Sequence, residues 1–274
     1  MKKVLSCSRR TDMVAFYYQQ IQNILQNKFY QKENLISKKI SKKIIQQDFS
    51  PENIHSIVLW SKNFANLINK PEALQDYNLF LQFTINNYSI QIEKNVIMYQ
   101  EALEQLERLI YKYGTEKINW RFDPIFFNNK DEEDYRLKSF HILCHRISEM
   151  GIKTCTFSFI DIYPHINLKF LDSNRFICSV SLNDKINFTK KMLDISSKYE
   201  IKLNTCAEYI HENFEEISCG KCIDGNKLTQ LFGGKISLTK DNTQRDLCNC
   251  TKSLDIGSYL YPCRHNCLYC YAQQ

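Results

Sequence analysis

The stretch INWRFDPIFF, residues 118–127, is an apolar run that carries two charged side chains, Arg121 and Asp123. Short runs rich in aromatic and β-branched residues are typical of buried strands. Five more such runs recur along the chain: KKVLSC (2–7), SIVLW (56–60), LFLQFTI (79–85), TCTFSFIDIY (154–163) and IKLNTCAE (201–208). The sequence therefore predicts six strands, each of which ends near polar or charged side chains.

Segments with helical spacing lie between several of these strands. Residues 95–114 and 134–151 stop at Gly114 and Gly151, as helices often do, and a further helical segment spans 187–200. Strands that alternate with helices favour parallel pairing through βαβ units. We therefore expect an α/β fold over residues 1–210, in the form of a partial or TIM-like (β/α) barrel.

The composition changes after residue 210. Residues 211–274 hold most of the glycines and most of the cysteines of the chain. A loop-dominated segment of this length has too small an apolar core to fold alone, and such segments are commonly stabilised by a bound metal. We expect residues 211–274 to form a cysteine-rich iron-sulfur extension that packs on the carboxyl ends of the strands.

Net charge and hydropathy bear on whether the protein binds nucleic acid, spans a membrane or is secreted. The formal charge of +6 is a mild excess for 274 residues. The densest basic segment, SKKISKK (37–43), is predicted to be a solvated helical face, so nucleic-acid binding has weak support. No run reaches the roughly 18 apolar residues of a membrane helix, and MKKVLSCSRRTDM does not form a secretory signal. We expect a cytoplasmic protein, with no membrane partner and with reduced cysteines.

Charged and amide side chains gather at the carboxyl ends of the predicted strands, where parallel α/β proteins place their ligand sites. The expected catalytic group is Arg9, Asp12, Lys62, Arg121, Asp123 and Glu208. The expected cofactor contacts are Arg10, Asn63, Gln82 and Tyr269. An arginine fork suits a carboxylate or a phosphate. The alternative is that these charges form structural ion pairs at the mouth of the sheet.

The chain closes on YPCRHNCLYCYAQQ, residues 261–274, in which Cys263, Cys267 and Cys270 have the spacing C-x3-C-x2-C. Three thiolates on a four-iron cube leave one iron without a protein ligand, and that iron can bind something else. A zinc site would need a fourth ligand, for which His265 is the local candidate. The spacing favours a 4Fe-4S cluster over zinc and leaves both open.

This motif, with Tyr269 before its last cysteine, resembles the cluster motif of the radical S-adenosylmethionine superfamily, and CLYCYA (267–272) is similar to its spore photoproduct lyase branch. The resemblance implies that S-adenosylmethionine binds the open iron. It also implies that an electron donor such as a flavodoxin or a ferredoxin reduces the cluster. A 5'-deoxyadenosyl radical then abstracts hydrogen from a substrate. The superfamily normally carries this motif after its first strand, whereas here it ends the chain.

A narrower resemblance covers nearly the whole chain. Its motifs are SCSRRTDMVAFY (6–17), VLWSKN (58–63), LQFTI (81–85), WRFDPI (120–125), TCAE (205–208), CIDG (222–225), RDLCNC (245–250) and SLDIGSY (253–259). With the cysteine tail, they resemble the family catalogued as domain of unknown function 1848, in which the three-cysteine motif is also carboxy-terminal. Cys7, Phe64 and Asn266 depart from that pattern without removing a proposed ligand.

A second group of cysteines precedes the tail. From spacing alone, C-x2-C at Cys219 and Cys222 followed by Cys248 and Cys250 is a pattern typical of structural zinc. The family resemblance instead implies a set of Cys206, Cys222, Cys248 and Cys250, without Cys219, that holds an auxiliary iron-sulfur cluster. Thiolate spacing does not choose between iron-sulfur and zinc.

Three functions follow from these motifs. The leading one is a radical S-adenosylmethionine enzyme that acts on an unknown substrate. The second is a non-enzymatic iron-sulfur protein for electron transfer or sensing. The third is a zinc-stabilised protein that binds nucleic acid.

Overall fold

The computed structural model describes residues 1–27, 29–36, 39–46, 48–173, 175–258 and 261–271. All six predicted strands are present: β1 (Lys3–Cys7), β4 (Ile54–Ser61), β5 (Leu79–Thr84), β6 (Ile118–Ile125), β7 (Thr154–Phe159) and β8 (Lys202–Thr205). Two strands of two residues each, β9 (Ser218–Cys219) and β10 (Leu254–Asp255), complete an eight-stranded sheet. The fold is α/β, as the sequence predicts.

Every pairing in this sheet is parallel, and the strand order is β10-β1-β4-β5-β6-β7-β8-β9. The order follows the chain except that β10 returns to lie beside β1. Among the described residues no pairing joins β9 to β10, so the sheet is open and TIM-like closure is not confirmed. The two edge strands are too short to close it, because each makes only two residue pairs with its neighbour.

Both edge strands come from the cysteine-rich segment after residue 210. This segment therefore extends the main sheet at both sides, and the boundary at residue 210 stays a prediction. Because of this placement, residues near the end of the chain lie beside β1, the first strand.

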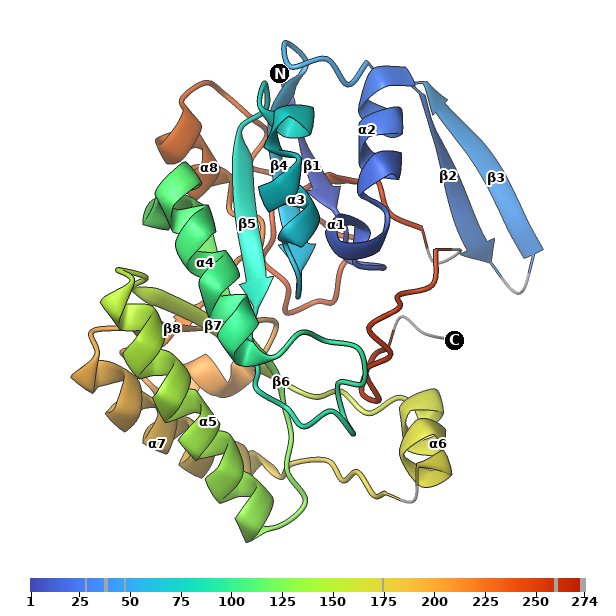
Figure 1. The fold of residues 1–274 in the computed structure, drawn as a ribbon. Helices are drawn as coiled ribbons and strands as arrows, with labels where there is room; N and C mark the ends of the chain where they lie inside the picture. The colour runs from blue at the N-terminus through green and yellow to red at the C-terminus, as the bar shows by residue number, and fades with distance from the viewer. Residues whose placement is uncertain (28, 37–38, 47, 174, 259–260, 272–274) are drawn as a thin grey trace.

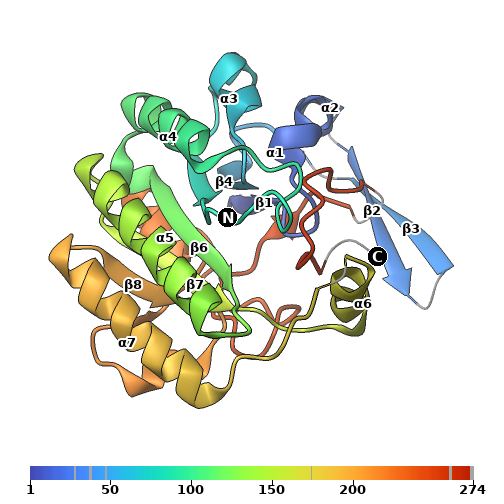
Figure 2. The same cartoon turned by 60° about the horizontal axis from the view of Figure 1, so that its bottom comes forward.

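Three long helices, α4 (Tyr99–Tyr113), α5 (Lys130–Glu149) and α7 (Leu182–Lys198), cover one face of the sheet, while the red end of the chain lies away from them (Figure 2). Helix α4 ends at Gly114, whose φ of 85° suits glycine. Helix α5 begins at Asn129, whose side chain accepts a hydrogen bond from a first-turn backbone N–H. The predicted helices are thus confirmed, with ends that shift by a few residues.

The shorter helices are α1 (Met13–Phe16), α2 (Tyr18–Asn27), α3 (Ala65–Asn69), α6 (Pro164–Asp172) and α8 (Gly225–Phe232), with 3-10 turns at Pro71–Leu74, Thr115–Lys117 and Tyr209–Asn213. None of the helices in the described ranges has the length and apolar character needed to cross a membrane.

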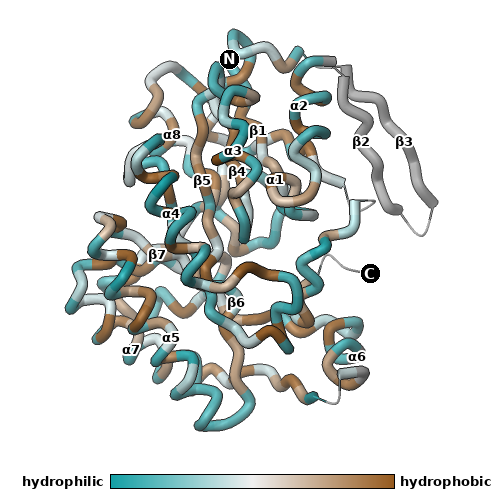
Figure 3. The backbone as a smooth tube through the Cα atoms, viewed as in Figure 1, coloured by the Kyte–Doolittle hydropathy of each residue, from teal (hydrophilic) through white to brown (hydrophobic). Residues whose placement is uncertain are grey.

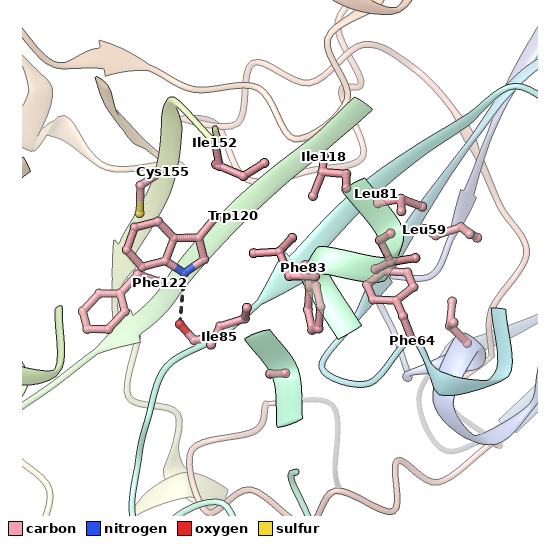
Figure 4. Packing of buried hydrophobic residues seen from close by; sticks show 14 of the residues in the cluster. Leu59, Phe64, Leu81, Phe83, Ile85, Ile118, Trp120, Phe122, Ile152 and Cys155 are labelled. Carbon is pink, nitrogen blue, oxygen red and sulfur yellow. Dashed lines mark hydrogen bonds between the residues drawn. The ribbon is translucent and has the colours of Figure 1, made fainter. Parts of the chain in front are cut away.

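Large apolar side chains fill the space between the sheet and its helices (Figure 4). Leu59, Leu81, Phe83 and Trp120 come from three neighbouring strands and are fully buried. The indole N–H of Trp120 donates to the carbonyl of Ile85 at 3.1 Å, so its one polar atom is satisfied. Burying each large side chain contributes roughly 1.5–3 kcal/mol. Hydrophobic residues concentrate along the strands while the helices also carry hydrophilic ones (Figure 3), so this core fixes the strands whose ends carry the site.

A separate antiparallel hairpin, β2 (Phe29–Ile36) and β3 (Lys39–Gln46), was not predicted. It lies at the edge of the molecule beside α2 (Figure 1). The expectation of a helical face at 37–43 is wrong from Lys39 onward, because that part is strand; residues 37 and 38 lie outside the described ranges. The isoleucines of KISKKIIQ favour a strand, and the lysine count concealed this preference.

Candidate functional site

A cavity of about 740 Å³, the main cavity, lies at the carboxyl ends of the parallel strands. Its lining combines residues that follow β1, β4, β6, β7 and β8 with residues from the end of the chain. The predicted site residues that line it are Arg9, Arg10, Asp12, Lys62, Arg121, Asp123, Tyr269, Cys206, Cys222, Cys248, Cys250, Cys263, Cys267 and Cys270. Both cysteine sets therefore face one cavity.

Three predicted residues are not among those that line the main cavity: Asn63, Gln82 and Glu208. Asn63 accepts a hydrogen bond from the Ala65 backbone at 2.9 Å at the start of α3. Gln82 donates to the carbonyl of Cys222 at 2.7 Å. The positions of Asn63 and Gln82 do not support the expected role as cofactor contacts, and that role stays a prediction.

Glu208 accepts a hydrogen bond from the backbone of Phe159 at 2.9 Å and pairs with Lys185 at 3.3 Å. Burial raises the pKa of Glu208, although Lys185 opposes the rise. Its carboxylate links β7 to α7, so its position does not support the expected catalytic role. Polar residues at strand ends also tie neighbouring elements together, and the sequence pattern does not separate the two uses.

Asp12 joins three parts of the chain. Its carboxylate accepts hydrogen bonds from the backbone N–H of Ala15 at 2.9 Å, from Ser61 Oγ at 2.8 Å and from the backbone N–H of Lys62 at 2.9 Å. His265 Nε2 lies 2.8 Å from the same carboxylate. Asp12 therefore caps α1, holds the end of β4 and contacts the loop between Cys263 and Cys267.

His265 is engaged through both ring nitrogens. Nε2 contacts Asp12, and Nδ1 lies 3.3 Å from the carbonyl of Asn95. Neither nitrogen is presented as a fourth ligand beside the three cysteines. The geometry thus gives no support to a zinc site completed by His265.

Backbone contacts also order the cysteine tail. Glu93 and Cys267 form an antiparallel bridge, the N–H of Leu268 donates to the carbonyl of Ile92 at 3.0 Å, and the N–H of Asn95 donates to that of His265 at 2.9 Å. Chain ends usually fray unless they are tied down. Here the irregular segment before α4 provides the partner.

Glu93 is the centre of a buried network that the sequence did not reveal. Lys62 Nζ lies 2.8 Å from Glu93 Oε1, Asn86 Nδ2 lies 3.2 Å from the same oxygen, and the Tyr269 hydroxyl donates to it. Burial alone would raise the pKa of Glu93, but Lys62 and these hydrogen bonds hold it below the ordinary value. Burial would lower the pKa of Lys62, yet Glu93 raises it. The pair therefore stays ionised beside Cys267.

Arg121 connects a predicted carboxylate to the second cysteine set. Its Nε and Nη2 donate to Asp123 at 3.2 and 2.6 Å, and its Nη1 donates to Cys222 Sγ at 2.9 Å. Burial would lower the pKa of Arg121, but Asp123 and the thiols of Cys222 and Cys206 raise it. A fixed cation thus lies against the sulfur atoms, where it can offset the charge of thiolates.

Cys206, Cys222, Cys248 and Cys250 are neighbours. The Sγ atoms of Cys206 and Cys222 are 3.4 Å apart. A hydrogen bond with Cys250 lowers the pKa of Cys248 to about 7 despite burial, and Cys222 and Cys250 affect each other's thiol pKa. Cys219 instead accepts a hydrogen bond from Asn249 at 3.0 Å and does not line the main cavity. The grouping matches the set without Cys219.

The three tail cysteines also influence one another. Burial, followed by the nearby Asp12, raises the pKa of Cys263 to about 11. Burial and Glu93 raise that of Cys267, and the thiols of Cys270 and Cys263 add to the rise. Within the described ranges, no three His, Cys, Asp or Glu side chains already have the geometry of a metal site. The donors are nevertheless soft thiols gathered at one cavity with cations beside them, which is the chemistry that iron-sulfur clusters and zinc require.

Asp255, which lines the main cavity, and Gly257 were not predicted as site residues. Asp255 accepts hydrogen bonds from Ser6 Oγ at 2.7 Å, Ser8 Oγ at 3.1 Å and the Arg9 backbone at 3.0 Å. A Cβ at Gly257 would lie 1.8 Å from Ser8 Oγ, so only glycine fits there. These contacts hold the end of the chain beside the first strand.

Residues 4–272 match the family described as Domain of unknown function (DUF1848), and the chain therefore belongs to that family. No curated protein matches the chain.

Proposed function

We propose that this member of the DUF1848 family is a radical S-adenosylmethionine enzyme that works on the carboxyl-end face of a partial (β/α) barrel. The observation that carries the proposal is the convergence of two cysteine sets, from distant parts of the sequence, on one cavity with buried Arg and Lys side chains. A cavity of about 740 Å³ is within the range of roughly 300–1,000 Å³ for small-molecule sites.

Cys263, Cys267 and Cys270 would hold a 4Fe-4S cluster with one iron open to S-adenosylmethionine. Together, the bound cluster and S-adenosylmethionine would supply a 5'-deoxyadenosyl radical once a donor such as a flavodoxin or a ferredoxin has reduced the cluster. Cys206, Cys222, Cys248 and Cys250 would hold the second centre.

The protein's own side chains would prepare this site. Arg121, in contact with Cys222, would offset the negative charge of the second centre. Burial would lower the pKa of Arg9, but the thiols of Cys250, Cys222 and Cys248 raise it, which places a second cation at the same sulfurs. The Lys62–Glu93 pair would fix Tyr269 and exclude water from the three-cysteine loop.

The guanidinium of Arg9 suits the carboxylate of S-adenosylmethionine or an anionic substrate. Arg9 has a buried Nη2 without a hydrogen-bond partner, and Arg10 lines the same cavity. A buried guanidinium nitrogen without an acceptor favours a ligand that brings one. Arg9 is therefore the leading candidate for a ligand contact.

One observation favours zinc at the second centre. The 3.4 Å separation of Cys206 Sγ and Cys222 Sγ is near the edge of a tetrahedron of thiolates, about 3.8 Å for zinc-sulfur bonds of 2.3 Å. Metal and sulfide analysis distinguishes the two. Iron with acid-labile sulfide at both sets supports an auxiliary cluster, whereas one zinc per chain supports a structural site.

The test is anaerobic reconstitution followed by reduction in the presence of S-adenosylmethionine. We expect 5'-deoxyadenosine from the full chain and none from the Cys263→Ala/Cys267→Ala/Cys270→Ala variant. Cys178→Ala is the matched control, because Cys178 is exposed and does not line the main cavity. Bound iron without cleavage in the wild-type chain would favour the electron-transfer or sensing alternative.

A further inference from the structure

A second cavity, of about 340 Å³, lies around the start of α5. Its lining includes the aromatic side chains of Tyr88, Phe126 and Phe170 beside several polar and charged ones, and it contains none of the predicted metal ligands. The Tyr88 and Tyr269 rings are 5.6 Å apart and the Phe126 and Tyr269 rings 5.9 Å apart. An aromatic wall therefore separates this cavity from the main one.

Arg136, on α5, lines the second cavity and is only 2% exposed. The guanidinium carbon lies 3.7 Å from the Tyr88 ring centroid and 4.5 Å from that of Phe122. Nη1 donates to the carbonyl of Asn86 at 2.8 Å. These contacts hold the group in place, but aromatic faces do not satisfy in-plane N–H donors.

The other edge of the same guanidinium lacks acceptors. Arg136 Nε and Nη2 are buried without a hydrogen-bond partner, and within the described ranges no carboxylate lies within ion-pair distance of Arg136. Arginine keeps its charge in proteins, and buried charges are almost always paired. This cation is thus unusual for a folded interior.

Arg121 shows what the edge is suited to hold. In Arg121 the corresponding atoms, Nε and Nη2, donate hydrogen bonds to the two carboxylate oxygens of Asp123 at 3.2 and 2.6 Å. A carboxylate or a phosphate matches this fork in a bidentate manner. Arg136, which lines the second cavity, presents the equivalent fork to no residue of the described chain.

The surroundings favour an anion. The cavity lies at the amino end of α5, a 20-residue helix, where the helix dipole is positive. Glu132 also lines the cavity, but its carboxylate already accepts hydrogen bonds from the backbone and side-chain N–H groups of Asn128 at 2.8 and 3.1 Å. It does not pair with Arg136.

We propose that the second cavity binds a small organic anion, with its carboxylate or phosphate on Nε and Nη2 of Arg136 and its apolar body among the aromatic rings. The volume is near the lower end of the range for ligand sites and suits a body of about one ring. The site is distinct from the cysteine-lined cavity and does not depend on the function proposed above.

Calorimetric titration of the full chain with benzoate, phenyl phosphate and the neutral benzamide tests this site. Benzoate or phenyl phosphate should bind at least tenfold more tightly than benzamide, and the better anion identifies the head group. Arg136→Lys should lose at least tenfold in that affinity, because an ammonium cannot present the fork. Arg146→Lys, on an exposed part of the same helix, should leave it unchanged. Equal affinity for benzoate, phenyl phosphate and benzamide would overturn the proposal.

A second variant leaves Arg136 intact and reports the location of the ligand. Phe176 lines the second cavity and is 77% exposed, so Phe176→Trp should fold and place an indole at the rim. Its fluorescence should change on addition of the better-binding anion and not of benzamide. Anion binding without any change in this emission would show that the anion occupies another place and would overturn the proposal, whether or not Arg136→Lys folds.

Discussion

The two cysteine sets line the same cavity but are held in different ways. The backbone around Cys206, Cys222 and Cys250 is tied to the sheet and to its own loops: the N–H of Cys206 donates to the carbonyl of Phe157 at 2.8 Å, and the N–H of Asp241 donates to that of Cys250 at 2.9 Å. The tail set depends more on buried side chains, above all Asp12 and Glu93.

Because the two sets are held differently, changes in them should affect stability and activity to different extents. The second set is joined to the β-sheet, so changes there should disturb both folding and metal binding. The tail is held by Asp12, by Glu93 and by backbone contacts with the irregular segment before α4, so its loss should remove activity while the sheet remains folded. The predictions that follow test this contrast.

The largest effect is expected from truncation after Tyr261. Every strand in the part of the chain that the structure describes precedes this point, so the far-UV circular dichroism should stay close to that of the full chain. S-adenosylmethionine cleavage should fall to background, because all three tail cysteines are removed. Truncation after Tyr271 is the control and should retain the activity. A short chain that still cleaves S-adenosylmethionine would refute the role of the tail.

Glu93→Gln should destabilise the metal-free protein by about 3–5 kcal/mol, since it leaves the buried charge of Lys62 without its partner. Urea denaturation measures the change. Glu104→Gln, an exposed position on α4, is the matched control and should be nearly neutral. The double variant Glu93→Gln/Lys62→Met should recover part of the loss; additive losses would show that the two side chains do not act as a pair.

The loss of stability at acid pH should also depend on the carboxylate of Glu93. The pKa of Glu93 is lower in the folded chain than its ordinary value of 4.5. A lowered folded-state pKa stabilises the protein above the unfolded value, and this contribution is lost as the pH falls through the folded pKa. The wild-type chain should therefore lose more stability than Glu93→Gln below about pH 4.5, with little difference in slope near neutral pH. An equal loss of stability in the wild-type chain and in Glu93→Gln at acid pH would contradict the lowered pKa of Glu93.

The smallest effect is expected at Cys219. Its side chain bonds Asn249 outside the main cavity, so Cys219→Ala should keep the metal content of the wild-type chain. Cys250→Ala is the comparison and should lose the second centre. Loss of metal in Cys219→Ala would restore the zinc pattern expected from C-x2-C spacing.

The strands were predictable because aromatic and β-branched runs such as INWRFDPIFF have a clear local signal. Arg9, Arg121 and the paired cysteine sets were found because they stand at strand ends or at metal-ligand spacing. The hairpin at Phe29–Ile36 and Lys39–Gln46 was missed, since its lysines drew attention to charge rather than to its isoleucines.

The supporting contacts could not be predicted from local pattern. Glu93 lies in an irregular segment, and its hydroxyl partner Tyr269 is 176 residues away. Hydrogen bonds between distant segments are likewise not visible in the local pattern of a strand. Gln82 stands in the middle of LFLQFTI, and no periodicity in that run shows that its amide bonds Cys222.

Electron paramagnetic resonance of the anaerobically reconstituted and reduced full chain tests the central claim most directly. S-adenosylmethionine should change the spectrum of a 4Fe-4S cluster, because it binds an iron that three cysteines leave open. The Cys263→Ala/Cys267→Ala/Cys270→Ala variant should lack the signal that responds. A cluster signal that S-adenosylmethionine leaves unchanged, or a protein that takes up only zinc, would contradict the account.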